Sequence, residues 1–189
     1  QPAISDDGAH VAFLSDATDL VSGGSGPVLG NVYAWERSSG SISLVSESIA
    51  AAEQRGNNST YAPVISGDGA YIAFYSYATD LVSGGSGPGT ANVYLWERTS
   101  GLLILLSESI AAANQRGNGS SYQPVISEDG AQVVFYSYAT DLLAGGTGPG
   151  NANVYVYELS SGLITLVSQS IGALGQRGNG ESYLAQISD

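Results

Sequence analysis

The hydrophobic and polar positions of the chain alternate in short runs, a pattern typical of β-strands. In the middle of the chain, apolar runs occupy residues 63–66, 70–77, 92–97 and 102–106 and are rich in β-branched and aromatic residues. An Asp-Gly pair at residues 68–69 separates the first two runs. This pair is a strong hairpin signal, because the turn needs a positive φ that glycine adopts without cost. We therefore expect four short antiparallel strands here.

The expected strands are apolar on both faces. In the second run, Ile72 and Phe74 point to one side, and Tyr71 and Ala73 point to the other. A sheet with one face in water alternates apolar with polar residues, and this run does not. Each small sheet should therefore be packed between two neighbours, as radially arranged propeller blades are.

The pattern recurs at a spacing of 61 residues without insertion or deletion, as Ile4, Ile65, Ile126 and Ile187 show. A fixed period of this length indicates a repeat architecture, in which each unit covers the next. We divide the chain into repeat 1 (1–62), repeat 2 (63–123) and repeat 3 (124–184). Residues 185–189 then form the first strand of a further repeat.

Three units leave the proposed ring incomplete, because propellers typically have four to eight blades. Two apolar blade faces would stay open, which predicts either further chain or self-association. An isologous dimer with six blades is one closed solution, and a head-to-tail assembly is another.

Composition limits the class of partner. The 189 residues include only 5 Lys and Arg against 17 Asp and Glu, which gives a net charge of −12. This balance excludes nucleic acid and anionic membrane surfaces, which both require clustered cations. The longest aliphatic stretch, residues 102–106, is too short for membrane insertion. A lysine-free, acidic chain rich in serine and tyrosine favours an extracellular, cell-surface or periplasmic location.

The motif Pro63-x-Ile65-Ser66-x-Asp68-Gly69-x-x-Ile72-x-Phe74 resembles the repeat signature of TolB-like β-propellers. It recurs at residues 2–13 and 124–135, and residues 92–101 resemble the third strand and turn of that family. The resemblance implies an all-β fold with blades of four antiparallel strands.

Repeats of this kind are similar to those of periplasmic protein-binding propellers, peptidase propeller domains and large bacterial surface proteins. Units of this length with an Ala-Thr-Asp-Leu stretch most resemble the surface-protein branch. That branch often carries an Asp-rich loop before the third strand, where Asn31, Asn92 or Asn153 stands here. This departure argues against an inherited calcium site.

Every unit repeats a Gln-Arg-Gly-Asn tetrad followed by a tyrosine. The candidate ligand-binding residues are Arg55, Arg116, Arg177, Asn57, Asn118, Asn179, Tyr61, Tyr122 and Tyr183. Arginine beside tyrosine could stack on a sugar or clamp a carboxylate of a partner. Alternatively, each arginine bonds loop carbonyls or an acid of the neighbouring blade, and we favour this second interpretation.

The repeated acids offer two further hypotheses. Asp7, Asp68 and Asp129 stand in the Asp-Gly turns, where a ring of carboxylates could gather a calcium ion. The favoured alternative is that each aspartate bonds the backbone of its own turn. In the Ala-Thr-Asp-Leu stretches, aspartates 19, 80 and 141 are expected to cap loops.

No catalytic constellation is recognisable. Glu36, Glu97 and Glu158 repeat one environment, whereas a glycosidase needs two differentiated acids about 5–10 Å apart. The single histidine, His10, is replaced by Tyr71 and Gln132 in the other units. Asn58 and Asn118 match the glycosylation sequon, which is weak evidence in serine-rich loops.

The sequence therefore predicts a non-catalytic extracellular or cell-surface repeat protein without a cofactor. We expect it to act as a structural, self-assembling or protein-interaction scaffold. Its expected partner is itself, as a homo-oligomer or as further repeats, together with surface proteins or glycans. The alternative is a multivalent, lectin-like propeller that binds carbohydrate through the repeated loops.

Overall fold

The computed structural model describes residues 2–84, 86–172 and 174–188, and none of them is helical. The strands form three four-stranded antiparallel sheets in which neighbours along the chain are neighbours in the sheet. Blade 1 contains β1 (Ala3–Ile4), β2 (His10–Ser15), β3 (Asn31–Glu36) and β4 (Ile42–Leu44). Blade 2 contains β5 (Thr60–Ile65), β6 (Tyr71–Ser76), β7 (Asn92–Glu97) and β8 (Leu103–Leu105). Blade 3 contains β9 (Ser121–Ile126), β10 (Gln132–Ser137), β11 (Asn153–Glu158) and β12 (Leu163–Leu166).

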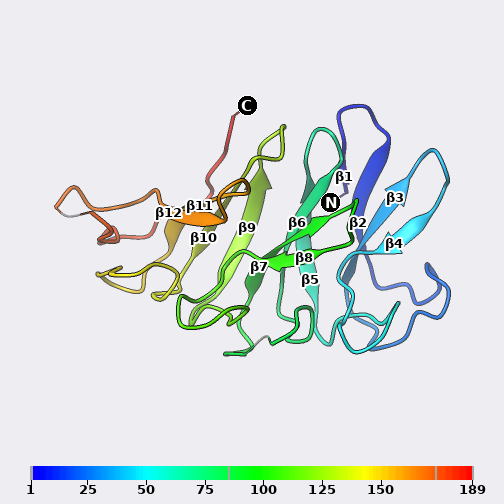
Figure 1. The fold of residues 1–189 in the computed structure, drawn as a ribbon, viewed down its shortest axis with the longest axis horizontal. Coiled ribbons are helices and arrows are strands. Elements are labelled where there is room, and N and C mark those ends of the chain that lie inside the picture. The colour runs from blue at the N-terminus through cyan, green and yellow to red at the C-terminus, as the bar shows by residue number, and fades with distance from the viewer. Residues whose placement is uncertain (1, 85, 173, 189) are drawn as a thin grey trace.

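The three sheets stand side by side like the blades of a fan (Figure 1). The all-β fold with four-stranded blades is thus confirmed. Among the described residues, no helix is long and apolar enough to cross a membrane.

The first strand of a blade is longer than the apolar pattern indicates. β5 begins at Thr60, three residues before the apolar run that predicted it. Its pairing register with β6 shifts between Tyr61 and Val64, and Ala62 adopts a positive φ of 49°. A bulge of this kind lets the strand pass Pro63, which cannot donate a ladder hydrogen bond.

The middle blade is covered on both faces, as its two-sided apolar pattern predicts. Ile72 and Phe74 belong to one buried cluster with Ala12 and Val32 of blade 1. On the opposite face, a second buried cluster joins Ala73, Val93 and Leu95 to Val133, Phe135 and Tyr155 of blade 3. Contacts between blades thus supply the core of this molecule.

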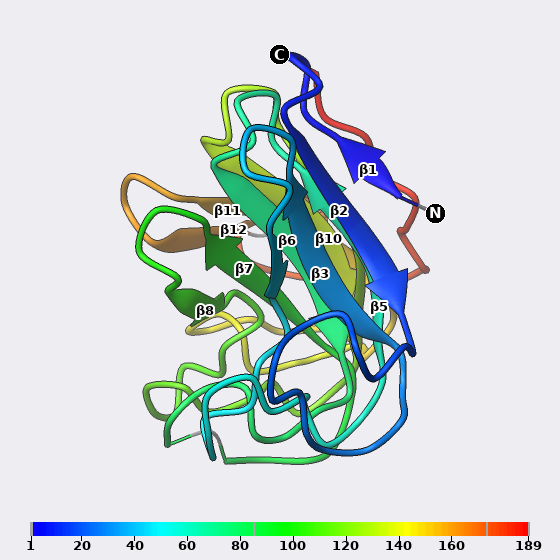
Figure 2. The same ribbon diagram turned by 90° about the vertical axis from the view of Figure 1, so that its right-hand side faces the viewer.

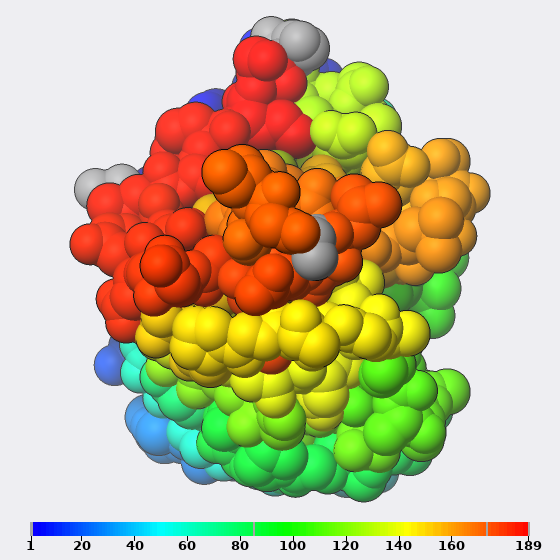
Figure 3. Space-filling view, turned by 90° about the vertical axis from the view of Figure 1, so that its left-hand side faces the viewer, coloured from blue at the N-terminus to red at the C-terminus, as the bar shows by residue number. Residues whose placement is uncertain are grey.

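In the described part of the chain, the outer blades each have one apolar face against which no neighbouring blade packs. On blade 1 we call Val11, Phe13 and Trp35 the leading face; they are only half-buried, whereas their equivalents on blade 2 are buried. On blade 3 we call Val134, Val154, Val156 and Val167 the trailing face; the first two are buried and Val156 is half-buried. Val167 is 56% exposed, while the equivalent Leu106 in blade 2 is fully buried. Figures 2 and 3 view the blade 1 end and the blade 3 end.

Candidate functional site

The three repeated arginines are buried and hold loops together. In blade 2, Arg116 donates from Nε to the carbonyl of Pro88 (3.2 Å) and from Nη2 to that of Gly87 (3.0 Å). Its Nη1 donates to the carbonyl of Thr79 at 3.2 Å. Arg55 and Arg177 bond the matching Gly-Pro pairs of their own blades. The structure therefore places these guanidinium groups within the loop scaffold, as the second interpretation expects; a ligand-binding role of the arginines stays a prediction.

The asparagines of the same tetrads connect neighbouring blades. Asn57 donates from Nδ2 to Thr79 Oγ1 (2.8 Å), and Thr79 N donates back to Asn57 Oδ1 (2.9 Å). The backbone N–H of Asn57 donates to Asp80 Oδ1 at 3.0 Å. Asn118 makes the same three bonds to blade 3. The Thr-Asp pairs of these Ala-Thr-Asp-Leu stretches thus hydrogen-bond the asparagine loop of the preceding blade. The sequence alone did not indicate this role.

The sequons share these loops. Asn58 is exposed, and its Oδ1 accepts only a local bond from the backbone of Ser59. Asn118 already uses its Nδ2 at the junction with blade 3, so a glycan there would displace a bond between blades. Asn179, the third asparagine of the set, accepts from Asn151 through its carbonyl and faces no following blade.

The tyrosines of the tetrad loops belong to a connected strip formed by Tyr61, Tyr75, Tyr77, Tyr122, Tyr136, Tyr138 and Tyr183. The rings of Tyr75 and Tyr122 meet across blades at 5.3 Å. The hydroxyls of Tyr77 and Tyr122 lie 3.3 Å apart. This hydrogen bond, together with burial, raises the pKa of Tyr77 to about 12. The strip ends in Tyr61 and Tyr183, which are 40% and 55% exposed.

Two of the repeated arginines act electrostatically on buried tyrosines outside this strip, Tyr33 and Tyr155, which the sequence did not single out. Burial raises the pKa of Tyr33 and of Tyr155, and the charges of Arg55 and Arg177 oppose that rise. Both tyrosines lie at the same position of the third strand in their blades. The sequence signal for these tyrosines is their repeated position in the tripeptide Asn-Val-Tyr.

The aspartates of the Asp-Gly turns are engaged by their own turns. Asp68 Oδ1 accepts from Ser66 Oγ at 2.6 Å and from the backbone of Ala70 at 2.9 Å. Asp7 and Asp129 repeat this pattern, and the serine hydrogen bond is the main cause that lowers the pKa of both. Within the described ranges, no group of three or more His, Cys, Asp or Glu is placed to hold a metal ion. The calcium alternative stays a prediction.

The repeated glutamates likewise serve local turns. Glu36 accepts from Ser39 Oγ at 2.8 Å, a bond that contributes most to lowering its pKa, and Glu97 accepts from Ser100 Oγ at 2.6 Å. The sole histidine packs beneath the next blade, where a Cβ on Gly69 would lie 2.4 Å from the ring of His10.

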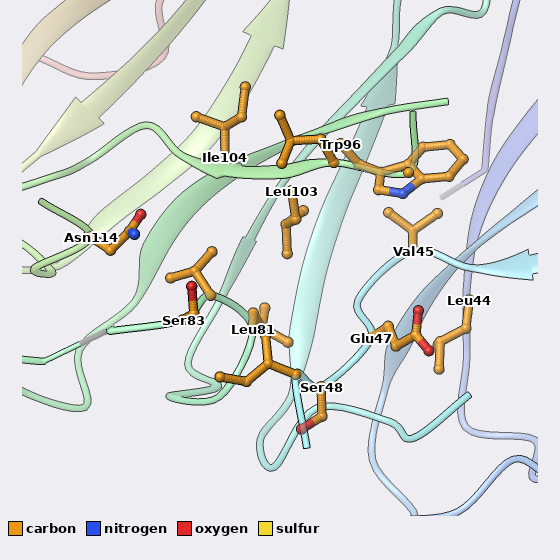
Figure 4. A pocket seen from close by; sticks show the side chains of 14 residues that line it. Leu44, Val45, Glu47, Ser48, Leu81, Ser83, Trp96, Leu103, Ile104 and Asn114 are labelled. Carbon is orange, nitrogen blue, oxygen red and sulfur yellow. The ribbon is translucent and has the colours of Figure 1, made fainter. Parts of the chain in front are cut away.

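A cleft of about 460 Å³ opens where blades 1 and 2 diverge (Figure 4). Val45, Leu81, Trp96 and Leu103 line it, and Glu47 is its one acidic group. A smaller cleft of about 230 Å³ with Glu108 occupies the same place between blades 2 and 3. These clefts repeat with the blades and are lined by one carboxylate each.

Blades that pack face to face around shared apolar clusters define a segment of a β-propeller. Neither the family models nor the curated proteins include a match to the chain. Among solved structures, it is similar to a putative TolB from Agrobacterium tumefaciens, with a TM-score of 0.50 and 18% identity over 87% of this chain and 47% of that one. It is also similar to dipeptidyl peptidase 4 from Porphyromonas gingivalis, with a TM-score of 0.52 and 11% identity over 95% of this chain and 27% of that one.

The chain spans less than half the length of either structure. At these identities the likeness establishes the fold alone. The fold is that of TolB-like propeller blades, so the resemblance read from the repeated motif is confirmed at the level of architecture.

Proposed function

We propose that the chain is a non-catalytic propeller scaffold that binds other protein surfaces through its two open blade faces. The observation that supports this proposal is that the repeated polar and apolar residues differ in whether the chain itself supplies their partners. The polar ones are engaged in loops, turns and junctions, whereas Phe13 and Trp35 are only half-buried and Val167 is exposed.

Covering these faces is energetically favourable. Burial of a large apolar side chain stabilises by roughly 1.5–3 kcal/mol relative to full exposure. The equivalents of Phe13 and Trp35 in blade 2 gain this stabilisation inside the chain. A partner that covers the leading face would recover a similar contribution, offset by the loss of rotational and translational freedom.

The scaffold would act outside the cytoplasm, at a cell surface or in a periplasm. The support is compositional: the chain has no lysine and a net charge of −12, with tyrosine and serine abundant. An acidic surface of this kind favours solubility and disfavours nucleic acid and anionic lipid.

The proposal is tested by the size of the protein in dilute solution. We expect the wild type to associate, and we expect Phe13→Asp to weaken association because it places a charge on the leading face. Val28→Asp is the matched control, since Val28 is 66% exposed in a loop and should leave association unchanged. Sedimentation velocity reports the size of all three proteins. A wild type that stays monomeric and binds no protein surface contradicts the proposal.

A second candidate function is carbohydrate binding, and the tyrosine strip favours it. Its partly exposed rings offer flat apolar surfaces beside hydroxyl groups, which suit the faces and edges of sugars. We expect Tyr61→Ala to reduce binding on a glycan array about tenfold if this function is correct, since one stacked ring contributes on the order of 1 kcal/mol. The same array with Arg37→Ala, which lies outside the strip, supplies the control. Absence of wild-type binding to any glycan removes this candidate.

A further inference from the structure

The two junctions inside the chain are built from the same parts. Between blades 1 and 2, the backbone N–H of Asp6 donates to the carbonyl of Gly67, and that of Ile49 donates to the carbonyl of Asp80. Between blades 2 and 3, Gly67 donates to Glu128 and Ile110 donates to Asp141. The asparagine bonds to the Thr-Asp pair repeat as well. In both junctions the asparagine loop lies on the trailing side of one blade, and the Thr-Asp pair that it bonds lies on the leading side of the next.

A leucine and a glycine complete each junction. A Cβ on Gly56 would lie 2.8 Å from Leu81, and a Cβ on Gly117 would lie 2.9 Å from Leu142. Each glycine therefore forms a socket that a leucine of the following blade fills. The equivalent Gly178 of blade 3 has only Ser168, Asn153 and Gly180 near its Cβ position. On blade 1 the equivalent leucine, Leu20, is only half-buried.

Blade 1 also contains a buried polar atom without a hydrogen-bond partner, Nη1 of Arg55. Contact with a preceding blade would complete its hydrogen bonding. Arg116 and Arg177 donate from Nη1 to the carbonyls of Thr79 and Thr140. Those threonines belong to loops that the preceding blade holds through its asparagine. In blade 1 the equivalent threonine is Thr18, and Nη1 of the buried Arg55 has no hydrogen-bond partner.

We infer that a second copy of this chain docks head to tail, with its blade 1 on blade 3 of the first copy. The contact reproduces the internal junctions: Leu20 of the second copy fills the socket at Gly178, and its Thr18 and Asp19 receive Asn179. This inference rests on the proposed scaffold function and names its partner. Contact between two like faces would place no asparagine loop against a Thr-Asp pair, so an isologous arrangement is disfavoured.

Two copies joined at both ends make a ring of six blades. Six lies within the range of four to eight that propellers use, whereas three copies would exceed it. A head-to-tail contact closes into a ring when its rotation permits and otherwise continues as a filament.

At this contact, residues 182–188 of the first copy and β1 of the second copy compete for the same edge of β2. Residues 185–188 hold the same phase of the repeat as residues 2–5, so both cannot pair with β2. Ser182 donates to Ala152 as Thr60 donates to Gly30, and Leu184 shares the positive φ of Ala62. Residues 182–184 therefore match the start of β5, a strand that pairs at four positions, whereas β1 pairs at two. Residues 182–188 should displace β1 of the second copy and pair with its β2.

The test compares two glycine substitutions in one loop. Gly178→Ala places a methyl group in the socket, and by analogy with Gly117 it should collide with Leu20 and weaken dimerisation by about tenfold or more. Gly172→Ala is the control, because blades 1 and 2 carry Ala50 and Ala111 at the equivalent position and both of their junctions are intact. Light scattering over a dilution series should give twice the 19.3 kDa chain mass for the wild type and for Gly172→Ala. Equal melting curves of the two variants at low concentration show that both fold.

The outcomes separate this inference from the broader function. Association of Gly178→Ala equal to that of the wild type overturns the head-to-tail contact but leaves the scaffold function standing. A monomeric wild type overturns the head-to-tail inference. The scaffold function is contradicted only if this monomer also fails to bind other protein surfaces. Hydrogen exchange supplies the independent check: amides of residues 184–187 should become protected in the dimer, and unprotected amides there overturn the strand exchange.

Discussion

At the scale of single residues, repeated polar side chains of this chain satisfy backbone groups that its long loops would otherwise leave unpaired. Arg116 serves three carbonyl oxygens with one buried guanidinium. Gly87, with a φ of 104°, lets the loop approach closely, because a Cβ there would lie 3.0 Å from the Arg116 carbonyl. The conformation of the loop and the placement of the arginine therefore depend on each other.

Replacement of Arg116 by alanine should destabilise the fold strongly. It removes three hydrogen bonds from a charged donor and leaves their carbonyl acceptors inside the loop, so we expect a loss of about 3 kcal/mol in the free energy of unfolding. Arg37→Ala removes one exposed contact at 3.4 Å and should change that free energy by less than about 0.5 kcal/mol. Urea unfolding followed by circular dichroism measures both variants. Equal effects would show that the loop carbonyls find other partners.

At the scale of elements, the sequence allowed prediction of the strands because their apolar runs are dense and the Asp-Gly turns are unambiguous. The start of β5 was missed, since the pattern gives no sign that Tyr61 pairs past the bulge at Ala62. The arginine and asparagine loops were recognised as repeated, but their partners lie 22 to 37 residues away in sequence. Hydrogen bonds at such separations follow from the packing of blades, which periodicity within one unit does not specify. The choice between a ligand surface and a loop clamp therefore needed the structure.

At the scale of the whole molecule, each blade contributes one face to a shared core and needs a neighbour for the other. Blade 2 has both neighbours, while the leading and trailing faces lack one each. The net charge of −12 opposes association between copies, so apolar contact and junction hydrogen bonds must outweigh repulsion. Added salt screens that repulsion and should strengthen the assembly.

The two tryptophans of the chain report directly on whether the open faces become covered. Trp96 lies inside the junction between blades 1 and 2, and Trp35 holds the equivalent position on the leading face. In a Trp96→Phe variant, Trp35 is the only indole, and acrylamide quenching of its fluorescence measures its exposure. We predict weak quenching at high protein concentration and stronger quenching on dilution, as the leading face is released. Strong quenching of Trp35 at every concentration would contradict the central claim that these faces are binding surfaces.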